Sequence, residues 1–258
     1  MLYKSKYGDI YYELTGQKGN PVIVLCHGIG MDHRTFAKQV DFLKKDYQVI
    51  VWDMPGHGRS TLTQYDTRFS LMAADCLVGL MDETGTDSAV LVGLSLGSLV
   101  IQHVLNRHAE RVIATVHIGG ISLYPKCSSL LKPLFLMTGV LRMMPSKMFY
   151  SSFAKHRANT PETRQYLEDA ISTTGKDLIL KITRDMGDDM IEGICEPPDR
   201  PMLITWGEDD FYNRRLSLKW HQRVSNSKKS VISQAHHIAN QDNWDAFNES
   251  LVSFLQTL

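Results

Sequence analysis

The chain contains 258 residues, and 43% of them are hydrophobic, which is ample to bury a core without disulfide bonds. Lysine and arginine together number 28, as do aspartate and glutamate, so the formal net charge is zero. This balance leaves no overall electric field to favour nucleic acid or an anionic membrane surface, so neither is expected as a partner.

The N-terminal segment MLYKSKYGDIYYEL lacks the apolar core of a secretion signal. No uninterrupted apolar segment approaches the roughly twenty residues that a membrane-spanning helix requires. A cytoplasmic protein without membrane insertion is therefore predicted. The cysteines are widely separated and form no C-x-x-C pair, which predicts reduced core thiols rather than disulfides or a zinc site. They are Cys26, Cys76, Cys127 and Cys195.

The chain opens with LYKSKYGDIYYELTG, whose alternating pattern and YGD turn predict an antiparallel hairpin at a sheet edge. Nearly continuous apolar runs then predict strands, and segments of helical period between them predict helices. The strands are expected at residues 21–27, 47–53, 89–95, 111–119, 201–207 and 229–235, and the helices near 33–44, 70–84, 96–109, 213–225 and 242–257. This βαβα order predicts an α/β fold, with a mostly parallel central sheet and helices on both faces.

One long block interrupts this alternation. Residues 121–198 contain no convincing strand but four stretches of helical character, CSSLLKPLFLMTGVLRM, PSKMFYSSFAKH, TPETRQYLEDAIST and GKDLILKITRDM. Thr160 and Pro161 are a typical helix start, because threonine accepts free amides and proline tolerates the first turn. We therefore expect a core domain formed by residues 1–120 and 199–258, with a helical cap at 121–198 inserted between two strands.

Gly93 to Gly97 read GLSLG, a G-x-S-x-G pattern between a predicted strand and a predicted helix. In a nucleophile elbow the turn at the serine is so sharp that only glycine neighbours let the strand and helix approach. The turn also places Ser95 at a helix N-terminus, where the dipole and free amides favour developing negative charge. Ser95 is therefore the predicted nucleophile, and the alternative is an ordinary strand-to-helix turn.

A serine hydroxyl needs a general base to take its proton and a third group to orient that base. The acid candidates are Asp209 and Asp210, after the predicted strand 201–207, although a lone acidic turn is often merely solvated. The base candidates are His236 and His237, between the last strand and the last helix. Neighbouring histidines rarely converge on one ion, and no other ligand cluster is evident, so no metal is expected. The order serine, acid, histidine is the one that a G-x-S-x-G nucleophile requires.

Two backbone amides are candidates for binding the oxyanion of a reacting carbonyl. His27 to Gly30, HGIG, end the first of the predicted parallel strands, and their small residues allow the backbone to bend toward such an oxygen. The second amide would come from Leu96, directly after Ser95. The glycine-rich turn DMPGHGRS is expected to be structural, with His57 as a packing or hydrogen-bonding residue.

Five motifs span the chain in order, HGIG, DMPGHGRS, GLSLGS, WGEDD and AHHIANQDNWDAFN, and together they resemble the α/β-hydrolase superfamily. The resemblance is to its small esterase and lactonase branch, which includes proteins like 3-oxoadipate enol-lactonase. It implies Ser95 as nucleophile, Asp210 as orienting acid and His237 as base, with Asp209 and His236 as the alternatives. It also implies an oxyanion hole formed by the amides of Ile29 and Leu96, and a cap that covers the site.

These residues predict a serine hydrolase that cleaves a carboxylic ester or lactone of a small, partly apolar substrate, without cofactor or metal. The same triad would serve a C–C bond hydrolase or a cofactor-free perhydrolase, and a hydrolase-like small-molecule receptor is the non-enzymatic alternative. A monomer or homodimer is expected. Substrate preference should reside in the cap, whose first half is rich in leucine, methionine and phenylalanine. Four cap arginines are candidates for binding a substrate carboxylate: Arg142, Arg157, Arg164 and Arg184.

Overall fold

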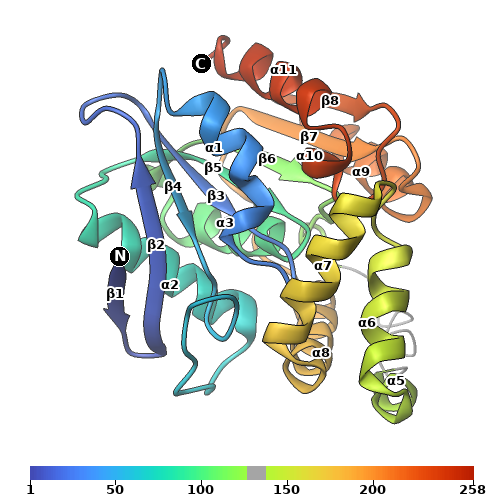
Figure 1. Ribbon diagram of the computed structural model, residues 1–258. Helices are drawn as coiled ribbons and strands as arrows, with labels where there is room; N and C mark the ends of the chain where they lie inside the picture. The colour runs from blue at the N-terminus through green and yellow to red at the C-terminus, as the bar shows by residue number, and fades with distance from the viewer. Residues whose placement is uncertain (127–137) are drawn as a thin grey trace.

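The computed structural model describes residues 1–126 and 138–258, whose strands form one eight-stranded sheet (Figure 1). Its order is β1-β2-β4-β3-β5-β6-β7-β8. β1 pairs antiparallel with β2, and β2 with β4, whereas every later pair is parallel. The predicted hairpin and mostly parallel sheet are confirmed. The strands are β1 (Leu2–Ser5), β2 (Gly8–Thr15), β3 (Val22–Cys26), β4 (Gln48–Trp52), β5 (Ala89–Leu94), β6 (Val112–Ile118), β7 (Met202–Gly207) and β8 (Ser227–Ile232).

Helices cover both faces of the sheet. In Figure 1, α1 and α11 lie in front of the strands, and α2 and α3 lie behind them. Helix α9 packs against β7 and β8. These helices are α1 (Ala37–Leu43), α2 (Phe69–Glu83), α3 (Leu96–Arg107), α9 (Phe211–His221), α10 (Ala239–Asp242) and α11 (Trp244–Leu255), with 3-10 turns at His33–Phe36 and Ala109–Arg111. The predicted α/β class is therefore confirmed.

The central strands are apolar at consecutive positions because helices cover both faces. Every residue of β5, AVLVGL, is buried, and so is every residue of β7, MLITWG. A strand of this kind cannot show the apolar-polar alternation of a half-exposed sheet. Continuous apolar runs were consequently the correct signal for locating these strands.

The last strand begins and ends earlier than expected. β8 covers Ser227–Ile232 rather than 229–235. Its first half contains the exposed Lys228 and Lys229, which an edge strand tolerates because one side of it faces solvent. Gln234 has a φ of 55°, which is incompatible with an extended strand, so the chain turns before residue 235.

Between β6 and β7 the described residues form four helices, and Figure 1 shows them grouped at one side of the molecule. They are α5 (Thr138–Met143), α6 (Ser146–Lys155), α7 (Pro161–Thr174) and α8 (Lys176–Glu192). Thr160 is the N-cap of α7, accepting the amide of Thr163, and Pro161 is its first residue, as predicted. Residues 127–137 of the first predicted cap helix lie outside the described residues.

Helix α8 is fixed to the N-terminus of α2 by two carboxylates. Asp185 accepts the backbone amide of Phe69, the first residue of α2, at 2.9 Å. The buried Asp189 accepts the hydroxyl of Ser70 and lies 3.2 Å from the guanidinium of Arg68. Negative charge at a helix N-terminus is favourable because free amides and the helix dipole meet there. Helix α8 is therefore held by charge as well as by apolar packing.

The prediction of core thiols is correct for two cysteines and wrong for a third. Cys26 and Cys76 are buried, and burial raises the pKa of Cys26 to about 12, so it is an unreactive thiol. Cys195 is exposed, since it lies in the chain that leads from α8 to β7. Cys127 is outside the described residues. Among the helices of the described residues, none is long and apolar enough to span a membrane.

Two buried histidines should make the fold sensitive to acid. Burial lowers the pKa of both His57 and His117 to about 3. Below about pH 6.5 the unfolded chain binds a proton on each imidazole, whereas the folded chain does not. The two neutral histidines therefore contribute fully to the free energy of unfolding above about pH 6.5. Below it this contribution is lost by about 1.4 kcal/mol per pH unit and per histidine.

Urea denaturation at about pH 7 and about pH 5 measures this loss as a difference in the free energy of unfolding. The variant His117→Gln cannot titrate, so its unfolding free energy should fall less steeply over the same interval. Equal steepness in the variant and the parent protein would contradict the assignment.

Candidate active site

The candidate site residues follow four strands at one edge of the sheet. Ile29 comes after β3 and Ser95 directly after β5. Asp210 and His237 come after β7 and β8. These strands are parallel, so their carboxyl ends meet at one edge and bring together side chains that are distant in sequence. All four residues line one cavity of about 440 Å³.

Ser95 occupies a strained turn. Its backbone has a φ of 52° and a ψ of −109°, and such positive φ costs a residue with a side chain on the order of 1–3 kcal/mol. Close packing maintains the turn, because a Cβ on Gly97 would lie 2.2 Å from the carbonyl oxygen of Cys26. A Cβ on Gly93 would lie 2.5 Å from the backbone of Gly97. The predicted steric need for glycine on both sides of Ser95 is thus confirmed.

A short hydrogen bond joins His237 and Asp210, whose Nδ1 and Oδ2 atoms are 2.7 Å apart. Asp210 is only 2% exposed and is the N-cap of α9. Burial raises the pKa of Asp210, but the hydrogen bond and charge of His237, with the donors of Asn213, outweigh burial and leave this pKa below its usual value. The carboxylate is therefore charged at neutral pH and can orient a histidine ring.

Asn213 belongs to this arrangement, although sequence reasoning missed it. Its side-chain amide donates to both carboxylate oxygens of Asp210, at 3.0 and 2.8 Å, and lies 3.0 Å from Nδ1 of His237. The sequence signal is DFYN, an N-cap aspartate followed three residues later by an amide side chain. Asn213 therefore fixes the orientation of the carboxylate that faces His237.

The two alternative residues have other partners. Asp209 accepts a 2.7 Å hydrogen bond from the side chain of Asn159, between α6 and α7. Nδ1 of His236 accepts the backbone amide of His237 at 2.8 Å. These contacts stabilise the loops that carry Asp210 and His237. The geometry thus favours Asp210 over Asp209 and His237 over His236 as the interacting pair.

The amide of Ile29 is oriented through the carbonyl that precedes it. His27 Nε2 accepts the amide of Met54 at 2.9 Å, so its Nδ1 carries the proton and donates to the carbonyl of Gly28 at 2.8 Å. The amide of Met31 donates to the same oxygen at 3.2 Å. The C=O and N–H of a trans peptide point in opposite directions, so these bonds also fix the direction of the Ile29 amide.

Leu96 provides the other candidate amide. It is the first residue of α3, where backbone amides lack an acceptor within the helix. Among the described residues, no acceptor receives the amide of Ile29 or of Leu96. Both N–H groups therefore remain available as hydrogen-bond donors, and Ile29 also lines the cavity that contains Ser95.

The helices between β6 and β7 supply apolar walls to this cavity. Phe153 of α6 and both Met186 and Met190 of α8 line it beside Ser95. The leucines and methionines expected to form the pocket lie earlier in the chain. Of those that the structure describes, Leu141 and Met144 line a neighbouring cavity of about 200 Å³, whereas Met143 and Met148 are exposed. Flexible methionines suit an apolar substrate of irregular shape.

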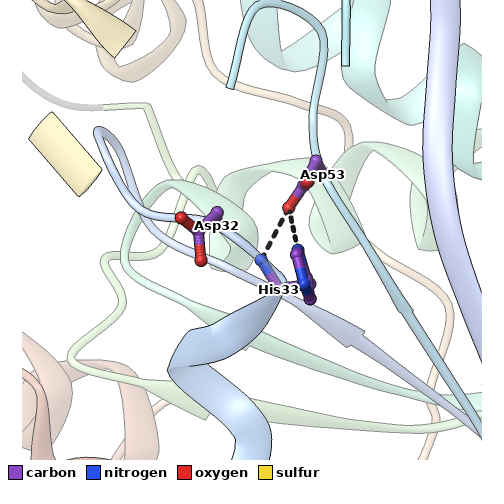
Figure 2. Close-up of side chains that lie close together, drawn as sticks. All are labelled: Asp32, His33 and Asp53. Atoms are coloured by element: carbon purple, nitrogen blue, oxygen red, sulfur yellow. Dashed lines mark hydrogen bonds and ion pairs between the residues drawn. The ribbon is translucent and has the colours of Figure 1, made fainter. Parts of the chain in front are cut away.

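Another cluster of acidic and imidazole groups does not line the Ser95 cavity. Figure 2 shows Asp32, His33 and Asp53, whose ligand-type atoms lie within 4.8 Å of one another. The backbone amide and Nδ1 of His33 lie 2.7 and 2.8 Å from Oδ1 of Asp53, and the amide of Arg59 donates to Oδ2 at 2.8 Å. Asp32 pairs with Arg34 at 2.6 Å. Each carboxylate oxygen already accepts N–H donors, so the cluster holds two loops together.

Known proteins resemble this chain over most of its length. A family model described as alpha/beta hydrolase fold matches residues 21–144. A pimeloyl-[acyl-carrier protein] methyl ester esterase from Vibrio atlanticus is 25% identical over 96% of this chain and 98% of its own length. A 2-hydroxy-6-oxo-6-phenylhexa-2,4-dienoate hydrolase from Comamonas testosteroni is 26% identical over 96% of this chain and 91% of its own. The enol-lactonase structure from Burkholderia xenovorans matches with a TM-score of 0.81 at 22% identity, covering 96% and 97% of the two chains.

The sheet order, the serine at the strand-to-helix turn and these similarities define an α/β-hydrolase fold. The chain therefore has this fold, and the proteins that it resembles are hydrolases of the α/β-hydrolase superfamily, the family that its five sequence motifs indicated.

Gly119, directly after β6, leaves room for the imidazole of His237. Its φ is 55°, and a Cβ there would lie 2.8 Å from Nδ1 of His237. Gly119→Ala should therefore displace the ring and break its hydrogen bond to Asp210, besides a backbone cost of about 1–2 kcal/mol. The downfield proton NMR signal of an imidazole N–H bound to a carboxylate should be present in the parent protein and absent from the variant.

Gly139→Ala is the matched control, because a Cβ at Gly139 would meet no atom within 4 Å. This variant should keep the signal. A signal that survives unchanged in Gly119→Ala would refute the steric argument.

Proposed function

We propose that the protein is a serine hydrolase that cleaves a carboxylic ester or lactone through an acyl-enzyme intermediate. One observation carries the proposal: Ser95, at a strained turn, lines the same cavity as a His237 ring that is hydrogen-bonded to the buried Asp210. A nucleophile, a base and a group that orients the base are the components that acyl transfer requires.

The proposed cycle assigns each group one task. His237 takes the hydroxyl proton of Ser95 while the serine oxygen attacks the carbonyl carbon. The tetrahedral oxyanion accepts hydrogen bonds from the amides of Ile29 and Leu96, and each such donor is worth about 3–4 kcal/mol in the transition state. The leaving alkoxide then departs with the proton from His237. Water activated by the same histidine hydrolyses the acyl-enzyme and restores Ser95.

Asp210 and Asn213 act on the base. Asp210 holds the proton on Nδ1 of His237, which leaves Nε2 free to accept the proton of the serine. Asn213 is a positioning residue, because it holds the carboxylate that faces the imidazole. None of these steps calls for a cofactor.

The substrate is proposed to be small and partly apolar. Support comes from the volume of the cavity and from Phe153, Met186 and Met190 in its wall. We propose that residues 121–198 act as a cap over a core of residues 1–120 and 199–258. A cytoplasmic monomer or homodimer remains the expectation for the whole protein.

A C–C bond hydrolase is the second candidate. The relative from Comamonas testosteroni is a dienoate hydrolase, and its identity to this chain, 26%, is close to the 25% of the esterase relative. The same serine, histidine and oxyanion amides would serve that chemistry. A comparison of ester and C–C substrates on one preparation separates the two.

A fluorophosphonate probe tests the nucleophile. The probe should label the parent protein, and Ser95→Ala should abolish labelling and lower kcat for p-nitrophenyl esters about ten-thousand-fold or more. The reason is that the serine oxygen forms the bond to phosphorus or acyl carbon. Mass spectrometry of the labelled peptide identifies the modified residue. Unchanged labelling of Ser95→Ala would place the nucleophile elsewhere.

The two histidines form a matched pair for the base. His237→Ala should slow acylation as severely as loss of the serine, whereas His236→Ala should cost less than about tenfold. If His236→Ala proves the more damaging, the base has been misassigned.

The pH profile tests the protonation state of the base. His237 must be neutral to accept the hydroxyl proton, so kcat/KM should fall about tenfold per pH unit once the imidazole is protonated. Asp210 should not produce this fall: burial raises its pKa, but its hydrogen bonds lower it below the usual value, so the carboxylate stays charged. Initial rates measured on one neutral ester across the acidic range give the profile. A rate that stays constant down to about pH 4.5 would rule out histidine as the base.

A further inference from the structure

Arg157 lines the cavity that contains Ser95 and His237. Of the four cap arginines considered from the sequence, it alone is in that lining, and Arg142 is instead 75% exposed and 3.8 Å from Asp177. Arg157 is partly buried and follows the C-terminal end of α6. A cation in a small, partly apolar cavity needs an anionic partner or solvent to offset the cost of its desolvation.

Within the described part of the chain, no acidic side chain forms an ion pair with Arg157. The remaining segment, CSSLLKPLFLM, contains no aspartate or glutamate. One guanidinium nitrogen makes a long hydrogen bond of 3.4 Å to the carbonyl of Phe153. The guanidinium also lies over the Phe153 ring, 3.5 Å from its centre. Most of its N–H donors are therefore available to a ligand.

The charge of Arg157 is retained at neutral pH. Burial lowers the pKa of its guanidinium to about 10, and the nearby charge of Asp210 opposes that shift. The two acidic side chains that line the same cavity have other partners, Asn159 for Asp209 and His237 for Asp210. The positive charge is thus directed into the cavity without being neutralised by either carboxylate.

Hydrogen bonds of the backbone fix the Arg157 segment relative to the loop that carries His237, the proposed base. Its carbonyl accepts the amide of Ile238, the residue after His237, at 3.2 Å. Two residues further on, the amide of Asn159 donates to Asp242 at 3.0 Å, and the amide of His236 donates to the same carboxylate at 2.9 Å. A residue that is already fixed in this way loses little conformational entropy when a ligand binds, which favours binding.

We propose that Arg157 binds a free carboxylate of the substrate, so that the ester or lactone cleaved at Ser95 carries a second, anionic group. This assignment rests on the proposed hydrolase function and adds the substrate class. The planar guanidinium matches a carboxylate with two parallel N–H donors. Lysine and additional arginines, which usually accompany a bound phosphate, are missing from the described lining of this cavity.

The position of Arg157 also suggests how the substrate lies. Arg157, Phe153 and Thr183 line both the Ser95 cavity and the smaller apolar cavity of about 200 Å³ beside it. Arg157 therefore lies where the two cavities meet. A substrate with its reacting carbonyl at Ser95 would reach Arg157 through an aliphatic segment that contacts the methionines of α8.

Paired substrates test this assignment. Mono-p-nitrophenyl adipate carries a free carboxylate, and its methyl ester is the uncharged counterpart. The ratio of their kcat/KM values should fall about 30-fold or more in Arg157→Gln, because loss of one partner of a desolvated ion pair costs that much. Arg157→Lys should recover part of the ratio, since the charge remains but the bidentate fork is lost. Arg142→Gln is the matched control, and its ratio should equal that of the parent protein.

Calorimetric binding to Ser95→Ala provides a measurement that does not depend on turnover. Adipate should bind to Ser95→Ala and bind about 30-fold or more weakly to the double variant with Arg157→Gln. Equal adipate affinity in the two proteins, or tighter binding of inorganic phosphate than of adipate, would overturn the carboxylate assignment.

If neutral esters are hydrolysed through Ser95 while the ratio does not change in Arg157→Gln, this inference fails and the proposed function stands. If no ester is hydrolysed but adipate binding requires Arg157, the proposed function fails and the anion site stands.

Discussion

The close approach of α3 to β3 is the constraint on which the rest of the site depends. Gly97 leaves no room for a side chain against the carbonyl of Cys26, so the helix begins almost in contact with the strand. The chain can join β5 to a helix in that position only by reversing within one residue, and Ser95 takes the positive φ that results. A serine at this point lies above the carboxyl edge of the sheet, with the first amides of α3 beside it. Packing between backbone atoms therefore determines where the reactive oxygen lies.

Around that fixed point, the remaining groups are held by hydrogen bonds between loops. Asp210 caps α9 and faces His237, while Asn159 joins the loop of Asp209 to the segment between α6 and α7. Asp242 accepts amides from that same segment and from His236. The strand-end loops and the segment that precedes α7 thus form one connected network, although they lie up to 83 residues apart in sequence. Displacement of one loop would disturb the others.

Much of the fold was predictable because its strands are buried on both faces, so continuous apolar runs such as AVLVGL located them. The sequence also allowed four site residues to be predicted, because each has a strict steric or chemical role: Asp210, His237, Gly93 and Gly97. Asn213 was missed because a polar residue in the first turn of a helix usually caps that helix and nothing more. The sequence also placed four arginines in the helical block without showing which one faces the cavity, since that depends on how α6 packs. For the same reason the apolar wall was expected in the first half of the cap, whereas Met186 and Met190 of α8 supply it together with Phe153.

The contacts between α8 and α2 anchor one helix of the helical block directly to the core. Asp185 and Asp189 bind the N-terminus of α2, which packs on the sheet. Helix α8 is therefore attached to the core, even though it lies between β6 and β7 in sequence. Met186 and Met190, which line the Ser95 cavity, are therefore anchored to the core through α8. A chimera that imports the block of a relative would have to preserve both carboxylates, or replace Arg68 and Ser70 along with it. Otherwise the partly buried guanidinium of Arg68 would lose the counter-charge of Asp189.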